Sequence, residues 1–361
     1  TPHTAAIRLP LYLAWRARRC PPSTSVLQDM NKALPKVSVI VTTYNQEDTL
    51  AATLESILAQ DCVFTFEIEL ADDCSTDSTG DICREYARRY PHIIRYTRNK
   101  VNRGARDNYF DTLLRCRAPY IADVAGDDLW CDTSKLRRQA DILDRNPDIT
   151  LVHTGWQYLD AATGATRPSD ADTTAPWMQP VADGRMLLEP LLAANGSMTV
   201  HSCTCLFRKQ TFIDAYKADE PLFRSGEYPC EDLQLIAVLA AAGKVAYIPD
   251  ITLNYRVGHS SQLTSAADAA RAFRFYFGTL RLRLRLQRKF GIRSAAIDRA
   301  NTKAAAYVSS RAFAAADSKA VSELLDFCHT AGIALPASTR AKLLLRHLPR
   351  PLFALLGRLR R

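Results

Sequence analysis

The stretch Tyr120-Ile-Ala-Asp-Val-Ala-Gly-Asp-Asp-Leu-Trp130 decides how the rest of the chain is interpreted. Its apolar start predicts a short buried strand, and the following Gly126, Asp127 and Asp128 predict a tight turn with two adjacent carboxylates. Paired carboxylates at a strand end suit a hard divalent cation such as Mg²⁺ or Mn²⁺, which commonly binds a diphosphate as well. A turn that only caps the helix after Asp132 fits these residues equally well.

The composition is that of a large globular protein. Hydrophobic residues make up 47% of the 361 positions and charged residues 24%, so disorder is not expected. No apolar run approaches the roughly 18 residues that span a bilayer. The ten cysteines lack metal-ligand spacing, and no neighbour in the sequence completes a zinc site around the close pair Cys203 and Cys205. We interpret them as reduced core residues of a cytoplasmic protein.

The net charge of +9 is concentrated at the two ends of the chain. Six basic residues and one acidic residue give residues 1–36 a charge of +5, and seven basic residues give residues 340–361 a charge of +7. The body between them is therefore at −3. A nucleic-acid enzyme would place positive charge in its cleft, so we exclude nucleic acid and expect an anionic membrane surface as a partner.

Both ends also differ from the body in pattern. Residues 1–34 predict an N-terminal arm outside the folded domain, with translation from Met30 as one explanation and an ordered amphipathic arm as the alternative. Residues 266–361 predict a basic helical extension. Its tail, 341–361, suits either a helix lying on the inner face of the cell membrane or a helical cover with a solvated basic rim.

Between the ends, strands and helices alternate. Strands are predicted at 37–45, 66–71, 93–96 and from Tyr120, with helical patterns between them. This alternation predicts an α/β fold with a mostly parallel central sheet flanked by helices. Ligands in such sheets bind beyond the carboxyl ends of the strands. The polar clusters Thr42–Asn45, Asp72–Asp73 and Asp127–Asp128 are therefore expected to meet at one cleft.

Four motifs follow one another along the chain: Val37-Ser-Val-Ile-Val-Thr-Thr-Tyr-Asn45, Asp72-Asp-Cys-Ser-Thr-Asp-Ser-Thr79, Asn102-Arg-Gly-Ala-Arg-Asp-Asn108 and Gly126-Asp-Asp-Leu-Trp130. In this order and spacing they resemble the nucleotide-binding half of the inverting family-two glycosyltransferases of GT-A fold. The resemblance covers about residues 35–265. It implies a Rossmann-like GT-A domain with a nucleotide-binding half, 35–130, and an acceptor half, 131–265.

The resemblance implies a site for a nucleotide-diphosphate sugar. Thr42 and Tyr44 would line the base and ribose, and Asp73 would accept a hydrogen bond from the base. The other expected donor contacts are Asp72, Arg103 or Arg106, Gly104, Asn108, Asp127 and Arg256. A divalent metal, Mn²⁺ or Mg²⁺, would bind Asp127, Asp128 and His259. The structural alternative for Asn108 is a bridge between two loops.

Two positions depart from the family pattern. Ala125 stands where the family's Asp-any-Asp motif begins with a carboxylate, so one acidic ligand or ribose contact is missing. Gly258 moves His259 by one place relative to the family's Tyr-Arg-any-His segment. His201, in a strand predicted over 196–208, would border the acceptor pocket, and a buried histidine bonded to the backbone is the alternative.

The acidic pair Glu231 and Asp232 precedes an apolar helical pattern. An inverting transfer requires a carboxylate that removes the proton of the acceptor hydroxyl. The resemblance gives this role to Asp232, with Glu231 orienting it or the acceptor. The alternative is that the acids only favour the helix dipole, an effect of about 0.3–1 kcal/mol.

These features predict a metal-dependent inverting glycosyltransferase. The donor would be a nucleotide-diphosphate sugar, and the acceptor a saccharide or lipid-linked saccharide in the biosynthesis of a surface polysaccharide such as lipopolysaccharide, O-antigen or capsule. A sugar nucleotidyltransferase would carry a Gly-rich basic loop after its first strand, which Thr42-Thr-Tyr-Asn45 lacks. A non-catalytic nucleotide-sugar binding module, suggested by Ala125, is the other alternative.

Overall fold

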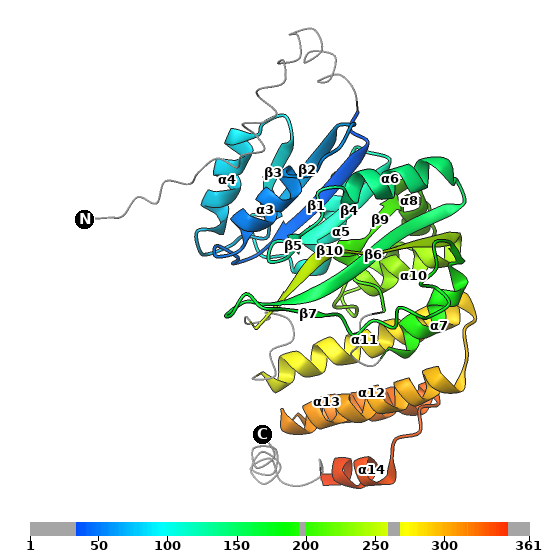
Figure 1. Cartoon of the computed structure of the whole chain (residues 1–361). Coiled ribbons are helices and arrows are strands. Elements are labelled where there is room, and N and C mark those ends of the chain that lie inside the picture. The colour runs from blue at the N-terminus through cyan, green and yellow to red at the C-terminus, as the bar shows by residue number, and fades with distance from the viewer. Residues whose placement is uncertain (1–33, 195–198, 259–267, 316, 346–361) are drawn as a thin grey trace, which may run out of the picture.

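The structure is a computed structural model that describes residues 34–194, 199–258, 268–315 and 317–345 (Figure 1). Within these ranges, ten strands form one sheet in the order β3-β2-β1-β4-β9-β6-β10-β5, with β7 beside β6 and β8 beside β10. The strands are β1 (Val37–Thr43), β2 (Phe66–Asp72), β3 (Ile94–Arg98), β4 (Tyr120–Ala125), β5 (Leu129–Trp130), β6 (Ile149–Asp160), β7 (Thr166–Pro168), β8 (Ala182–Asp183), β9 (Leu206–Arg208) and β10 (Lys244–Val257). The helices are α3 (Leu50–Leu58), α4 (Thr79–Arg89), α5 (Ala105–Arg115), α6 (Lys135–Arg145), α7 (Arg185–Ala193), the 3₁₀ turn η1 (Ser202–Thr204), α8 (Lys209–Ala218), α9 (Glu220–Arg224), α10 (Asp232–Ala242), α11 (Ala269–Phe290), α12 (Ala295–Ala314), α13 (Ser318–Ala331) and α14 (Ala337–Leu344).

The six longest strands of the sheet, β1, β2, β3, β4, β6 and β10, all run in the same direction, and the four short strands run against them. Strand β1 pairs in parallel with β2 on one side and β4 on the other, and β3 continues the parallel set beyond β2. Strand β9 is antiparallel to β4 and β6, whereas β6 and β10 are parallel. The predicted α/β fold, with a mostly parallel sheet and a helical C-terminal region, is confirmed.

Helices cover both faces of the sheet, which explains the nearly continuous apolar sequence of β1. Val39 and Val41 pack on one face with α3, α4 and α6. Ile40 points to the other face, where it packs with α5 and α10. Ile121 of β4 belongs to this second face too. Polar side chains therefore emerge mainly where the strands end.

The predicted strand over 196–208 is wrong in its central part. Within the described part of this stretch, residues 202–204 form the turn η1, and the strand, β9, is Leu206–Arg208. The His201 carbonyl accepts hydrogen bonds from the backbone N–H of Thr204 (3.0 Å) and from its hydroxyl (2.7 Å). These local bonds replace strand pairing and turn the chain.

Helix α11 joins the C-terminal helices to the sheet domain (Figure 1). Leu282 and Leu286 pack into the core that contains α5 and α10, and Phe277 packs with α12 and α13. Gly278 lies against the loop before α10, where an added Cβ would stand 2.4 Å from the Glu227 carbonyl oxygen. Arg281 pairs with Glu227 (2.5 Å) and with Glu323 of α13 (2.7 Å). The helices thus brace this loop.

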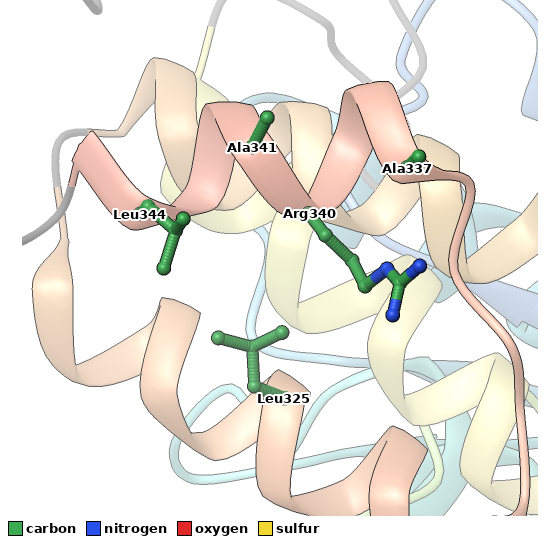
Figure 2. A pocket seen from close by; sticks show the side chains of 5 residues that line it. All are labelled: Leu325, Ala337, Arg340, Ala341 and Leu344. Atoms are coloured by element: carbon green, nitrogen blue, oxygen red, sulfur yellow. The ribbon is translucent and has the colours of Figure 1, made fainter.

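A hollow between α13 and α14 is seen in Figure 2, lined by Leu325, Ala337, Arg340, Ala341 and Leu344. Among these five lining residues Arg340 alone is ionisable, so the hollow lacks the groups that sugar transfer needs. None of the helices in the described ranges is long and apolar enough to cross a membrane. Most of the predicted N-terminal arm, the predicted boundary at 265–266 and residues 346–361 of the tail lie outside the described residues.

Candidate active site

The three predicted polar clusters meet at the carboxyl ends of β1, β2 and β4. The Thr42 carbonyl accepts a hydrogen bond from the Gly126 N–H (3.2 Å), and the Thr43 carbonyl accepts one from the Asp73 N–H (2.9 Å). Thr42 and Tyr44 are half-buried at this edge. The parallel register of β1 with both neighbours therefore brings these distant segments together.

Asp73 shapes the loop that leads into α5. One carboxylate oxygen accepts hydrogen bonds from Asn99 Nδ2 (2.8 Å) and the Arg103 N–H (2.9 Å), and the other accepts one from the Gly104 N–H (2.8 Å). Gly104 has φ +85°, a conformation that favours glycine. The buried Asn108 bonds to Asn99 (3.0 Å) and to the Ala71 carbonyl (3.3 Å), so its side chain bridges two segments.

Several predicted phosphate or nucleotide contacts have partners inside the protein. Asp72 is fully buried, accepts a hydrogen bond from the Ser75 N–H (2.8 Å) and lies 3.3 Å from Arg98. Arg103 pairs with Asp111. These two side chains support the loops around the site, and any donor contact would compete with existing bonds.

Arg106 connects the nucleotide half to the acceptor half. Its guanidinium donates to the carbonyls of Ser225 and Tyr228, the latter at 2.9 Å, and pairs with Asp107. Both carbonyls lie in the loop before α10, which carries Glu231 and Asp232. The charge of Arg106 also acts on Glu231, where it partly opposes the rise in pKa. The acidic pair therefore lies close to the start of α5.

Asp232 and Glu231 occupy the first turn and N-cap of α10. Asp232 is exposed and accepts a hydrogen bond from the Leu233 N–H (2.7 Å), and Glu231 is half-buried. Desolvation by the surrounding protein raises the pKa of both groups, and the Asp232 charge raises the pKa of Glu231 further. A pair of this kind holds a proton more strongly than isolated acids do, as proton-transfer groups often must.

The Asp127–Asp128 turn is held by β10. Asp128 is 1% exposed, and its carboxylate accepts a hydrogen bond from the Arg256 N–H (3.0 Å). Arg256 Nε donates to the Asp127 carbonyl (2.9 Å). Burial and the neighbouring Asp127 charge raise the pKa of Asp128. The structure thus brings Arg256 to the two aspartates, while His259 lies outside the described residues.

Asp123 is a site residue that the sequence analysis missed. It is 6% exposed, and one of its carboxylate oxygens has no hydrogen-bond partner among the described residues. Burial raises the pKa of Asp123 to about 7, and the Asp232 charge contributes to the rise. Asp123 therefore lies within electrostatic reach of the acidic pair. The sequence could have indicated Asp123, because it is an aspartate within an apolar strand. Its side chain lies on the same face of the strand as Ala125, two residues later.

Possible metal ligands also converge at Asp128, with two residues that the sequence analysis did not expect to bind a metal. Asp128, His201 and Cys203 offer donor atoms that all lie within 4.8 Å of one another, and all three residues are buried. It is the one such group among the residues that the structure describes. His201 lies two residues before Cys203, but the sequence could not show that Asp128, from the β4–β5 turn, completes the group.

Comparison with known proteins gives the class of this site. Residues 38–213 match the model of the family described as glycosyl transferase family 2. The predicted resemblance to that family is confirmed.

Two relatives show how much of the chain is matched. The chain is 30% identical to the uncharacterized protein Rv1520 of Mycobacterium tuberculosis over 223 residues, which are 61% of this chain and 58% of that protein. It is 38% identical to the putative glycosyltransferase EpsE of Bacillus subtilis over 126 residues, 35% of this chain and 45% of that protein. The chain therefore spans less than two thirds of the length of these curated relatives.

A solved structure shares the fold. S. aureus TarS 1–349 in complex with UDP-GlcNAc matches 90% of this chain and 89% of its own, with a TM-score of 0.57 and 17% sequence identity. This likeness confirms the GT-A architecture.

Proposed function

We propose that this protein transfers a sugar from a nucleotide-diphosphate donor to a hydroxyl group of an acceptor, with inversion. One observation carries the proposal. The acidic start of α10 lies beside the carboxyl ends of the parallel strands, held there by Arg106 and within electrostatic reach of Asp123 on β4. A carboxylate next to a nucleotide-type cleft is what inverting transfer requires.

The donor would bind at the edge formed by β1, β2 and β4. Thr42 and Tyr44 are available to line a base and ribose, and Asp73 holds the loop beside them. Family membership, and the capture of TarS with UDP-GlcNAc, support a nucleotide sugar as the donor. Arg256 beside Asp127 offers a cationic group for the diphosphate.

Asp127 and Asp128 suit a divalent cation. One carboxylate oxygen of Asp128 accepts a hydrogen bond from the Arg256 N–H. Burial and the Asp127 charge raise the pKa of Asp128, and a nearby positive charge would oppose that rise. A bound cation would stabilise the negative charge that develops on the leaving diphosphate. His259, the third ligand implied by the family resemblance, lies outside the described residues.

Asp232 would accept the proton of the attacking hydroxyl. Because the pKa of Asp232 is raised, its carboxyl group loses its proton at a higher pH than an ordinary aspartate does. The rate of transfer should therefore rise with pH and level off above the pKa of the pair. Glu231, whose pKa is raised by burial and by the Asp232 charge, would orient Asp232 or the acceptor.

The acceptor would belong to a cell-surface polysaccharide. The matched relatives include a putative teichuronic acid biosynthesis glycosyltransferase of Bacillus subtilis, 33% identical over 111 residues, which are 30% of this chain and 42% of that protein. A saccharide or lipid-linked saccharide is the corresponding acceptor class. A lipid-linked acceptor would be met at the inner membrane face, where the basic tail could bind anionic lipid.

A panel of nucleotide sugars, assayed for donor hydrolysis and transfer with and without chelator, tests the proposal. Asp232→Asn should lower kcat at least about 100-fold with little change in donor KM. Asp214→Asn changes an exposed carboxylate of α8 that bonds to Gln210, and should leave the rate unchanged. Donor binding without turnover would favour a binding module. Pyrophosphate release in a parallel assay with a nucleoside triphosphate and a sugar 1-phosphate would favour a nucleotidyltransferase.

A further inference from the structure

We propose that Asp128, His201 and Cys203 form a buried site for a thiophilic divalent cation of the Zn²⁺ class. Their donor atoms all lie within 4.8 Å of one another. A tetrahedral zinc ion, with bonds of about 2.0–2.3 Å, holds its donors roughly 3.3–3.8 Å apart. Small side-chain rotations would therefore close the three groups around one ion.

The backbone around the ligands is already fixed. The His201 carbonyl accepts from the Thr204 N–H (3.0 Å), and Trp130 Nε1 donates to the Cys203 carbonyl (3.0 Å). The His201 ring packs against Tyr255, with ring centroids 4.7 Å apart. The Asp128 carboxylate accepts from the Arg256 N–H. The ligands are thus presented before any ion binds, which limits the conformational entropy that binding would remove.

His201 supplies an independent sign that a ligand is missing. The residue is 6% exposed, and its Nε2 atom is buried without a hydrogen-bond partner among the described residues. Its Nδ1 atom accepts one long hydrogen bond, from the Cys203 N–H (3.3 Å). A buried ring nitrogen without a partner destabilises the fold. An ion held by Nε2 would remove that penalty, with the ring proton moved to Nδ1 and the long bond from the Cys203 N–H given up.

Charge balance also favours a dication. Asp128 is 1% exposed and Cys203 is 4% exposed, so two anions in these positions would be costly without a counter-charge. A carboxylate, a thiolate and a neutral imidazole around one divalent ion give a net charge of zero. The competing account keeps both acids protonated, with the thiol donating to the carboxylate.

The ligand set selects the metal. Thiolate and imidazole favour Zn²⁺ and Co²⁺, whereas Mg²⁺ prefers carboxylates, carbonyls and water. The inference depends on these three side chains and not on sugar transfer, although Asp128 belongs to both sites. The ion would lie next to Asp127, and its charge would act at the edge of the sheet proposed to bind the donor diphosphate.

Titration of the chelator-stripped full-length protein with Co²⁺ tests the site. We expect about one Co²⁺ to bind per chain, with the ultraviolet charge-transfer absorption of a thiolate–cobalt bond. Cys203→Ser should abolish that absorption, and His201→Gln should weaken Co²⁺ binding at least about tenfold while keeping it. Cys205→Ser removes a buried thiol two residues from Cys203 and should leave both signals unchanged.

The wild-type protein alone can overturn the inference. Failure of the stripped wild-type chain to show thiolate–cobalt absorption refutes it, whether or not the variants fold. Persistence of the absorption in Cys203→Ser also refutes it. The Co²⁺ titration contains no nucleotide sugar, so its result does not depend on sugar transfer. If the protein binds Co²⁺ in this way but transfers no sugar, the metal site is supported and the proposed activity is rejected.

Discussion

Replacing Asp123 with asparagine should make the stability of the protein less sensitive to pH. Burial raises the pKa of Asp123 from its ordinary value of 3.8 to about 7. The folded chain then holds this proton more tightly than the unfolded chain, so the contribution of Asp123 to wild-type stability falls as the pH rises from 3.8 toward 7. The amide side chain does not titrate. The free energy of unfolding of Asp123→Asn, relative to that of the wild type, should therefore rise by roughly 2–3 kcal/mol between about pH 5 and about pH 8.

Urea unfolding of chelator-treated protein at both pH values, followed by circular dichroism, measures this difference. Asp77→Asn is the control. Burial alone would raise the pKa of Asp77, but hydrogen bonds from Thr79 and Glu47 outweigh it and lower the pKa. Asp77 is therefore ionised in both states across this window, and its variant should differ from the wild type by a constant amount. A constant offset for Asp123→Asn as well would show that Asp123 does not carry a buried, perturbed charge.

Two further substitutions test the loops around the site. Asp73→Ala removes the acceptor of three hydrogen bonds, from Asn99 and from the backbone of residues 103–104. It should lower the free energy of unfolding by about 3 kcal/mol. Unchanged urea unfolding and unchanged proteolysis of this loop would contradict that role. Gly278→Ala would place a Cβ 2.4 Å from the Glu227 carbonyl oxygen and should destabilise the protein by about 1–3 kcal/mol, whereas Thr279→Ala next to it should have a smaller effect in the same urea assay.

The features that the sequence predicted well are local. The β-branched run of β1 and the acidic start of α10 are encoded by neighbouring residues, and both elements are present where the patterns placed them. The meeting of Thr42, Asp73 and Gly126 also followed from the sequence, because the carboxyl ends of parallel strands share one edge of a sheet.

The features that the sequence did not predict depend on side-chain direction and on distant segments. A motif match placed Asp72 and Arg103 in a donor site, but it could not show that Arg98 and Asp111 already pair with them. Residues 202–204 form the turn η1 where a strand was predicted. The hydrogen bonds to the His201 carbonyl that stabilise this turn could not be inferred from a propensity pattern.

The bracing of the loop before α10 by α11 limits how this protein can be recombined with its relatives. Gly278 leaves no room for a side chain, and Arg281 pairs at once with Glu227 and with α13. A chimera that received foreign C-terminal helices would need the matching segment 225–232 as well. Segment 225–232 and the helical region should therefore be exchanged between such proteins as one unit.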